Sequence, residues 1–408
     1  MRSYAAYTIL VAEAAYAFPW VVNAPGVDSS MLPNRDLFKR QQVPEGPGSA
    51  AQCPFNPNHV PAVPIQPGQY NNAINGKQGN GKGGYQVPAP GDTAHRFIAP
   101  TSRDIRGPCP GLNTAANHGF LARDGIVTYN ELVDAQQNVY NVGYDLANLL
   151  AFLGLQADGD LVTTKLSIGC EATTRTSINP ALTGSQPGLA GHNKFEADTS
   201  LTRNDFFTGK GDNFKFNRTL FDMMSATTGG LHNVENLAIY RGERWDQSVQ
   251  ENPNFFFGPL SLLLFGAASF LYELFPSGPN YIPDQATMNS FFIEERLPNN
   301  WINRIEPYSN RLVTQEILKM YLLNPRPFGG NVGDNTFAPL DWRDLISNGT
   351  IKKDIQPAAV SCLLYQLATQ SVPSTLNGVV TPTVEAISFF LTRVAPQFDN
   401  LGCPIPLT

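Results

Sequence analysis

Charge is scarce in this chain of 408 residues, and so is histidine. Only 15% of the residues are charged, the net charge is −6, and there are five histidines. A nucleic-acid-binding protein needs a basic face, so this composition argues against that class. Runs that alternate between apolar and polar residues are also rare, and no internal repeat is present. These absences favour a mainly α-helical fold, and the 35 glycines and 33 prolines indicate long loops.

Cysteine is sparse as well. The five are Cys53, Cys109, Cys170, Cys362 and Cys403. In a secreted chain an odd number leaves at least one thiol with a use other than an internal disulfide. The sequence does not decide whether Cys53 and Cys170 pair with each other.

One long apolar run is present, GPLSLLLFGAASFLYELF at residues 258–275. Its length approaches that of a membrane span. Pro259, Glu273 and the clustered Gly and Ser residues favour instead a buried helix that lines a cavity. We therefore expect no membrane anchor.

The N-terminus has the pattern of a secretory signal. Arg2 provides a positive start, residues 9–17 are largely apolar, and Ala15-Tyr16-Ala17 fits a small-x-small cleavage site. Glu13 interrupts the apolar stretch, and a buried N-terminal helix is the alternative. We expect residues 1–17 to be a signal peptide and the protein to be secreted.

Two further features agree with secretion when taken together. Lys39-Arg40 is a dibasic pair of the kind at which propeptides are processed. Asn217 and Asn348 each begin an N-glycosylation sequon. Each of these features is common by chance, so only the set supports a secreted glycoprotein.

The chain divides by composition near residue 96. Residues 41–100 are rich in Pro, Gly, Asn and Gln and cannot bury much apolar area. We expect residues 18–95 to form an extended, surface-wrapping arm or a linker, with a candidate propeptide that ends at Arg40. Residues 96–408 show no clean internal boundary and are predicted to form one domain, with its ordered body starting near Phe97.

Helical periodicity is clearest in residues 129–155, where apolar residues recur at spacings of three, four and seven. Thr128 and Glu131 form a capping-box pattern at the start of this segment. Residues 311–323 and 384–394 have similar periodicity. These three segments are predicted to be helices.

The most distinctive cysteine is Cys109, which stands between Pro108 and Pro110. The prolines restrict the backbone and block a regular helix at the cysteine itself. A helix that starts directly afterwards, near residues 112–118, would point backbone N–H groups at the sulfur and lower its pKa. Such a thiolate suits an axial ligand of haem iron. A disulfide-bonded cysteine in a Pro-rich loop is the alternative.

The longer string RGPCPGLNTAANHGFLARDG, residues 106–125, decides between these readings. It closely resembles the signature of the fungal haem-thiolate peroxidases, the family of chloroperoxidase and the unspecific peroxygenases. The resemblance implies a single large helical domain that binds haem b. It also implies that Cys109 is the proximal ligand of the iron.

A second block, FEADTSLTR at residues 195–203, resembles the family's cation-binding segment. Its carboxylates and hydroxyl are hard oxygen ligands that suit Mg²⁺. The resemblance implies that Glu196, the backbone carbonyl of Ala197 and Ser200 hold Mg²⁺ beside a haem propionate. Phe195 matches an aromatic residue of the substrate pocket. A charged, solvated loop is the alternative reading of this block.

The resemblance continues, more loosely, toward the C-terminus. Residues 252–255 (NPNF) open the segment that carries the distal acid–base pair in peroxygenases. The apolar run that follows, including Phe270, predicts an apolar distal pocket. Cys362 and Cys403 correspond to a C-terminal disulfide of long peroxygenases, which would stabilise the fold by about 2–5 kcal/mol.

The chain departs from the family at the distal acid. The family's glutamate moves a proton between the two peroxide oxygens, but that position falls at or next to Ala267, and the arginine position falls on Leu260 or Ser261. Glu273 is the nearest carboxylate, and an offset of six residues places it about 600° around a helix, on another face. Glu273 is therefore a candidate base, with a helix-end or salt-bridge residue as the favoured alternative.

His192 and His232 are further candidates for the distal role, and His118 lies after the thiolate on the proximal side. Each is expected to be a hydrogen-bonded structural residue. The leading hypothesis is a haem-thiolate peroxidase or peroxygenase that uses hydrogen peroxide or an organic hydroperoxide to oxidise small apolar or aromatic molecules. The alternatives are a haem-thiolate rearrangement or dehydration enzyme that needs no added peroxide, and a haem-binding protein that has lost turnover.

Overall fold

The structure is a computed structural model of the chain. It describes residues 46–179, 185–277, 281–332, 336–340 and 346–352, together with positions 355, 358–360, 362 and 396. The predicted signal peptide, the dibasic pair, the predicted helix at 384–394 and Cys403 lie outside the described residues.

Helices dominate the described part of the chain, as the composition predicted. In chain order they are α3 (Pro110–Asn117), α4 (Tyr129–Tyr140), α5 (Tyr144–Asp158), α6 (Thr173–Thr176), α8 (Arg218–Thr228), α9 (Val234–Glu251), a 3-10 turn (Pro259–Ser261), α10 (Leu262–Glu273), α11 (Gln285–Phe292) and α12 (Asn310–Leu323). The mainly α fold class is confirmed.

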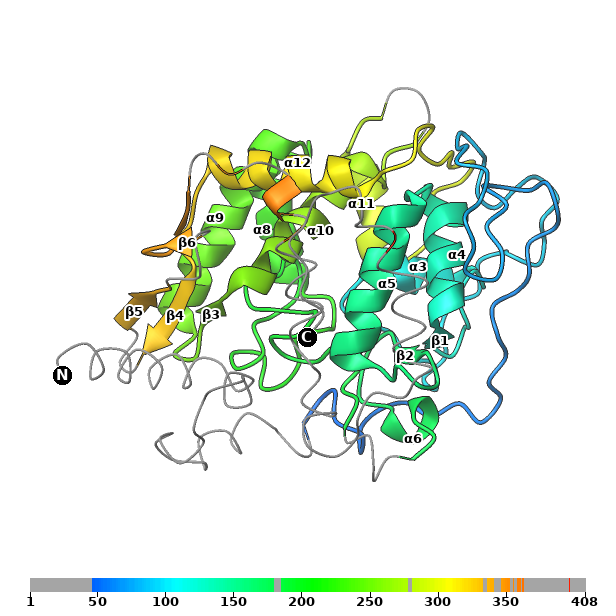
Figure 1. Ribbon diagram of the computed structural model, residues 1–408, viewed down its shortest axis with the longest axis horizontal. Coiled ribbons are helices and arrows are strands. Elements are labelled where there is room, and N and C mark those ends of the chain that lie inside the picture. Colours follow the sequence, from blue (N-terminus) through cyan, green and yellow to red (C-terminus); the bar gives the residue numbers. More distant parts are fainter. Residues whose placement is uncertain are drawn as a thin grey trace.

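The helices form two groups (Figure 1). Helices α4 and α5 pack against each other next to α3, while α10 packs on α9 and α12, and α8 packs on α9. Helix α11 contacts α3, and its Phe292 lies 5.6 Å from Phe221 of α8 between ring centroids, so α11 joins the two groups. The buried apolar side chains of both groups belong to one continuous core, so residues of the two groups can face one another across a single interior.

The strands of the described residues are short. Strands β1 (Ile126–Thr128) and β2 (Lys165–Ser167) form an antiparallel pair, β3 (Phe256–Phe257), β4 (Gly329–Val332) and β5 (Thr336–Pro339) form a three-stranded antiparallel sheet, and β6 (Ile346–Ser347) and β7 (Thr350–Ile351) form a hairpin. In Figure 1 the three-stranded sheet lies at the outer edge of the second helix group.

The Pro/Gly-rich arm lies against the helices along its described length. Residues 46–100 contain no regular helix, and side chains of α4 bond their backbone at intervals. Glu131 accepts a hydrogen bond from the Ala62 N–H at 2.6 Å, and Asn138 both donates to and accepts from the backbone of Ala73 at 2.8 and 3.1 Å. These contacts supply the backbone partners that a chain without secondary structure otherwise lacks.

The predicted single helix over residues 129–155 is two helices. Its start is as predicted, because Thr128 and Glu131 form a complete capping box. The break falls at Asn141, whose backbone is left-handed at φ 53°. The Asn141 side chain donates to the carbonyls of Arg304 and Ile305 at 3.1 and 2.9 Å. Asparagine tolerates this conformation, and tertiary hydrogen bonds decide where the helix ends.

The long apolar run forms the 3-10 turn and α10, most of which is buried as predicted. Helix α10 has 12 residues. Among the described residues, no helix combines the length and the apolar character needed to cross a membrane. The predicted helix at residues 311–323 is confirmed as α12, which begins one residue earlier with Ser309 as its cap.

Two cysteines whose pairing the sequence left open form a disulfide. Cys53 in the arm bonds to Cys170 behind β2, with 5.5 Å between their Cα atoms. Cys362 is also disulfide-bonded, and its implied partner Cys403 is not among the described residues. Cys109 is a free thiol, as its predicted use as a ligand requires.

Candidate functional site

Cys109 is the residue from which the candidate site is built. It is the N-cap of α3, with Pro110 in the first turn, and its side chain is half-buried. Its side chain accepts no cap hydrogen bond, but the backbone N–H groups of Gly111 and Leu112 at the start of α3 favour the charged form of the sulfur. Burial nevertheless outweighs these donors and raises the pKa of the thiol, so the predicted net lowering is not found.

A side chain of α3 holds the loop that precedes Cys109. Asn113 accepts a hydrogen bond from the N–H of Gly107 and donates one to its carbonyl, both at 2.9 Å. Gly107 has no room for a side chain, because an added Cβ would lie 1.6 Å from the carbonyl oxygen of Ile168. The position of the sulfur is therefore set by close packing and by one bidentate amide.

The candidate cation segment lies in the loop between α6 and α8. Glu196 is buried, and its Oε1 has no hydrogen-bond partner among the described residues. Burial raises the pKa of Glu196 to about 7, against the hydrogen bond from Ser200 and the charges of Arg203 and Arg241, which lower it. An unpartnered buried carboxylate oxygen next to a hydroxyl is what a hard cation requires.

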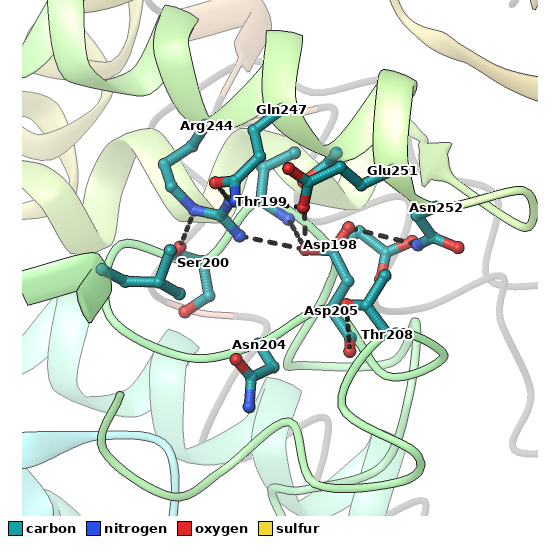
Figure 2. A network of polar contacts seen from close by, with 12 residues as sticks. Asp198, Thr199, Ser200, Asn204, Asp205, Thr208, Arg244, Gln247, Glu251 and Asn252 are labelled. Atoms are coloured by element: carbon teal, nitrogen blue, oxygen red, sulfur yellow. Dashed lines mark hydrogen bonds and ion pairs between the residues drawn. The ribbon is translucent and has the colours of Figure 1, made fainter. Parts of the chain in front are cut away.

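The other acidic residues of this loop are engaged elsewhere (Figure 2). Asp198 accepts hydrogen bonds from the side chain of Asn252 and from the N–H of Phe256, each at 3.1 Å. Asp205 pairs with Arg244 at 3.1 Å and accepts a second hydrogen bond from the same Asn252 amide, also at 3.1 Å. These carboxylates connect the loop to the start of the distal segment and are not open to a metal.

Side chains of helix α9 bind the backbone carbonyl groups that follow in the loop. Side chains of α9 donate hydrogen bonds to three successive carbonyls: Arg241 to Thr199, Arg244 to Ser200 at 2.9 Å, and Tyr240 to Leu201 at 2.7 Å. None of these bonds from α9 uses the Glu196 carboxylate, the Ala197 carbonyl or the Ser200 hydroxyl.

The three remaining oxygens are the ones that the resemblance assigned to Mg²⁺, and their chemistry fits that ion. The described residues hold no group of three or more His, Cys, Asp or Glu side chains suited to a metal. A cation here would thus depend on one carboxylate with two neutral oxygens. Mg²⁺ itself stays a proposal.

One face of α10 is less buried than the rest of the helix. Ala267 is exposed, whereas Ala268 and Ser269 are buried. Leu260, Leu263 and Phe270 lie at helical spacing from Ala267, and all three are half-buried. The side chains on this face are apolar and none can carry a proton, and the distal pocket stays a prediction.

One contact places the end of α10 relative to α3, and a second places Phe195 relative to α5. Phe275, directly after α10, lies against Gly111 of α3, since a Cβ on that glycine would be 3.6 Å from the ring. Phe195 is half-buried and lies next to Gly154 of α5, where an added Cβ would be 3.9 Å from the ring. The end of α10 is thereby brought to the start of the cysteine-bearing helix. The assignments of Phe195 and Phe270 as pocket walls stay predictions.

Glu273 is occupied by an ion pair with Arg304, which also donates a hydrogen bond to the Glu273 carbonyl at 3.2 Å. Burial raises the pKa of Glu273, and the charge of Arg304 lowers it. The favoured salt-bridge interpretation is therefore confirmed. The assignment of Glu273 as a base is not supported by any contact of its carboxylate.

The three histidines are hydrogen-bonded, as expected. His192 shares a hydrogen bond with Asp198 at 3.3 Å, and His232 contacts the Pro283 carbonyl at 3.3 Å. His118 lies between the His95 carbonyl at 2.9 Å and the Leu297 N–H at 3.2 Å. Burial lowers the pKa of His118 to about 4, so its ring stays neutral near pH 7.

Sequence reasoning missed the residues that hold the site together. Asn113, Glu295, Arg241 and Arg244 make the contacts that position the cysteine loop and the cation segment. The sequence of α9 held one indication of these contacts. Arg241, Arg244 and Ser248 lie on one face of the helix, and this polar face is buried. Buried arginines at helical spacing require acceptors from another segment.

Comparison with known proteins agrees with this geometry. Residues 95–306 match the family model described as "Peroxidase, family 2". The chain is 38% identical over 226 residues to an aromatic peroxygenase of Coprinellus radians, which covers 52% of this chain and 84% of the relative. It is 30% identical over 338 residues to the dothistromin biosynthesis peroxidase dotB of Dothistroma septosporum, which covers 76% and 81%.

A third relative, the aromatic peroxidase fscJ of Fusarium equiseti, is 28% identical over 345 residues, which covers 76% of this chain and 78% of the relative. The matched residues include Cys109, the cation segment and α10. The family of these proteins consists of peroxide-using oxidoreductases, and the fold is helical as that family requires. The chain belongs to the fungal chloroperoxidase family, peroxidase family 2.

Proposed function

We propose that this protein is a haem-thiolate peroxygenase that oxidises small apolar or aromatic molecules with a peroxide, and that Cys109 is the axial ligand of the iron. The observation that carries the proposal is the free Cys109 sulfur at the start of α3, where the N–H groups of Gly111 and Leu112 favour its charged form. When bound there, haem supplies iron whose oxidising chemistry a thiolate ligand strengthens.

Residues of the chain stabilise the charge on the sulfur and bind the substrate. The N–H groups of Gly111 and Leu112 stabilise negative charge on the sulfur. Leu263, Ala267 and Phe270 offer an apolar face that favours binding of an apolar substrate and excludes water. The names of the relatives, which include aromatic peroxygenase and aromatic peroxidase, support an aromatic substrate class.

The test is the absorption spectrum of the purified protein, reduced and exposed to carbon monoxide. A strongly red-shifted Soret band is expected, and Cys109→Ala is expected to abolish that band. Retention of the band in Cys109→Ala would contradict ligation by Cys109. Absence of haem in protein produced with ample haem would contradict the whole proposal.

A second candidate function follows from Ala267. The open face of α10 carries no carboxylate, so no side chain there can move a proton between the oxygens of hydrogen peroxide. Turnover of an organic hydroperoxide without turnover of hydrogen peroxide would favour a rearrangement or dehydration enzyme. If hydrogen peroxide is turned over only by Ala267→Glu, the natural protein is a haem-binding protein without peroxygenase turnover.

We further propose that Glu196, the Ala197 carbonyl and Ser200 hold Mg²⁺. The unpartnered Glu196 Oε1 supports this assignment. Metal analysis of the holoprotein should find one Mg²⁺ per chain, and Glu196→Gln should lose it. An unchanged Mg²⁺ content in Glu196→Gln would contradict the site.

Secretion is also a proposal, with a signal peptide at residues 1–17. Asn348, which begins a sequon, is exposed in the turn between β6 and β7. Sequencing of the N-terminus of the protein from culture medium gives the cleavage site. A protein found only inside the cell with Met1 intact would contradict the proposal. The relative named for dothistromin biosynthesis suggests a role in a natural-product pathway.

A further inference from the structure

Arg203 is a buried cation that the proposed function does not use. Arg203 follows Ser200 by three residues, and only 1% of its surface is exposed. Its Nη1 donates to the Thr202 hydroxyl at 2.9 Å, but its Nε has no partner among the described residues. A buried guanidinium is costly unless opposite charges offset it, so the charges around Arg203 need to be identified.

The nearest opposite charge belongs to Glu295, which follows α11. Its Oε1 lies 4.0 Å from the Arg203 Nη2. The same Oε1 accepts a hydrogen bond from the Asn113 side chain at 2.7 Å, and the Glu295 carbonyl accepts one from Asn117 at 2.9 Å. Glu295 is thus bonded to α3, the helix that begins at Cys109, and paired with the arginine.

The backbone of Glu295 indicates that this position is held by its surroundings. Its φ is +47°, in the left-handed region that residues other than glycine rarely adopt. Such a conformation costs about 1–3 kcal/mol and persists where tertiary contacts require it. The contacts here are the two asparagines of α3 and the arginine.

The charges that act on Cys109 include one cation and one anion. Arg203 favours the charged form of the sulfur, whereas Glu196 disfavours it. Conversely, Cys109 is among the groups that stabilise the charge of Arg203, after Glu295 and Glu196. The pair of Arg203 and Glu295 is bonded through Asn113 to the helix that Cys109 caps, and Coulomb interactions inside the protein are stronger than in water.

We propose that Arg203 is the fixed positive charge that balances the Cys109 thiolate and thereby sets the reduction potential of the haem iron, and that Glu295 positions and partly offsets this charge. The proposal rests on the proposed ligation of iron by Cys109. Arg203 and Glu295 are positioning residues, because they act on the iron through the sulfur and its surroundings.

The sign of the effect follows from electrostatics. A fixed positive charge stabilises the ferrous state, which carries one more electron than the ferric state. Removing the charge in Arg203→Met should make the reduction potential more negative. Removing the opposing charge in Glu295→Gln should make it more positive, and the Gln side-chain oxygen can still accept from Asn113. A purely structural role would not shift the two variants in opposite directions.

The experiment is a spectroelectrochemical titration of the holoprotein and its variants. Arg203→Met and Glu295→Gln are expected to shift the potential in opposite directions, and Arg203→Lys, which keeps the charge, should stay near the natural protein. Arg326→Met is the matched control, because it removes an arginine that pairs with Asp246 and not with a residue bonded to α3. It should not shift the potential.

The carbon monoxide spectrum of each variant separates the two proposals. If the natural protein lacks the thiolate-type band, ligation by Cys109 fails, and this proposal fails with it. If the band is retained in every variant but both potentials are unchanged or shift in the same direction, the role of Arg203 is overturned. If Arg203→Met does not retain haem, the test rests on Glu295→Gln. The proposal then requires that Glu295→Gln has a more positive reduction potential than the natural protein.

Discussion

Arg241 donates hydrogen bonds to both oxygens of Thr199, its backbone carbonyl and its side-chain hydroxyl, the latter at 2.8 Å. Thr199 has a φ of +69°, which a β-branched residue rarely adopts. The arginine therefore holds the cation segment in a strained conformation that it would not keep alone. This strain lies between Ala197 and Ser200, two of the residues assigned to the cation.

Replacing Arg241 should consequently destabilise the protein. Arg241→Met leaves two buried acceptors of Thr199 without a partner, and we expect a loss of about 3 kcal/mol in the free energy of unfolding. Urea denaturation measures this value. The exposed pair of Arg218 with Asp222 is the control, since Arg218→Met should cost less than about 1 kcal/mol. Equal losses in the two variants would contradict the role of Arg241.

Glu131 performs two tasks that separate variants can distinguish. Its carboxylate completes the cap of α4 with Thr128, and it accepts a hydrogen bond from Ala62 in the arm. Thr128→Ala should cost about 1 kcal/mol through the cap alone. Glu131→Ala should cost more and should also speed proteolysis of residues 46–100. If proteolysis is equally fast in both variants, Glu131 does not hold the arm.

The site divides into parts that a sequence can and cannot predict. Cys109, its helix and the capping box are local features, because chain neighbours decide them. The helix break at Asn141 and the ion pair of Glu273 depend on Arg304, which is distant in sequence from both. Contacts between residues so far apart in the chain produce no regular spacing in the sequence, so the sequence does not predict them. The same holds for Glu295, whose partners in α3 precede it by about 180 residues.

Asp158 at the end of α5 predicts a dependence of stability on pH. Both its carboxylate oxygens are buried without a hydrogen-bond partner among the described residues, and burial raises its pKa from 3.8 to about 8. The folded state therefore keeps this proton up to about pH 8, while the unfolded chain releases it near pH 4. The contribution of Asp158 to the free energy of unfolding falls as the pH rises between these values, by up to about 1.4 kcal/mol per pH unit.

Asp158→Asn should remove that part of the slope, because an amide does not titrate. Urea denaturation of the natural protein and the variant between pH 5 and pH 8 measures the difference. Asp222→Asn, which changes an exposed carboxylate, should leave the slope as it is. Parallel pH profiles for the natural protein and Asp158→Asn would show that Asp158 is ionised in the folded state.

Glu273→Gln distinguishes a structural carboxylate from a catalytic base. The ion pair with Arg304 occupies the Glu273 carboxylate, and the open face of α10 lies around Ala267, six residues away. We expect the rate of peroxide-dependent turnover to change less than tenfold, while the free energy of unfolding falls by about 1–3 kcal/mol. Loss of a general base would instead lower the rate by about 10²–10⁴-fold.

Arg304→Met is the matched variant for this measurement. It breaks the same ion pair but leaves the carboxylate in place, so a structural role predicts similar losses of stability and nearly natural turnover in both variants. Suppose instead that Glu273→Gln lowers turnover a hundredfold with its haem spectrum intact, while Arg304→Met does not. Glu273 would then be the base that compensates for Ala267, and the arginine would only restrain it.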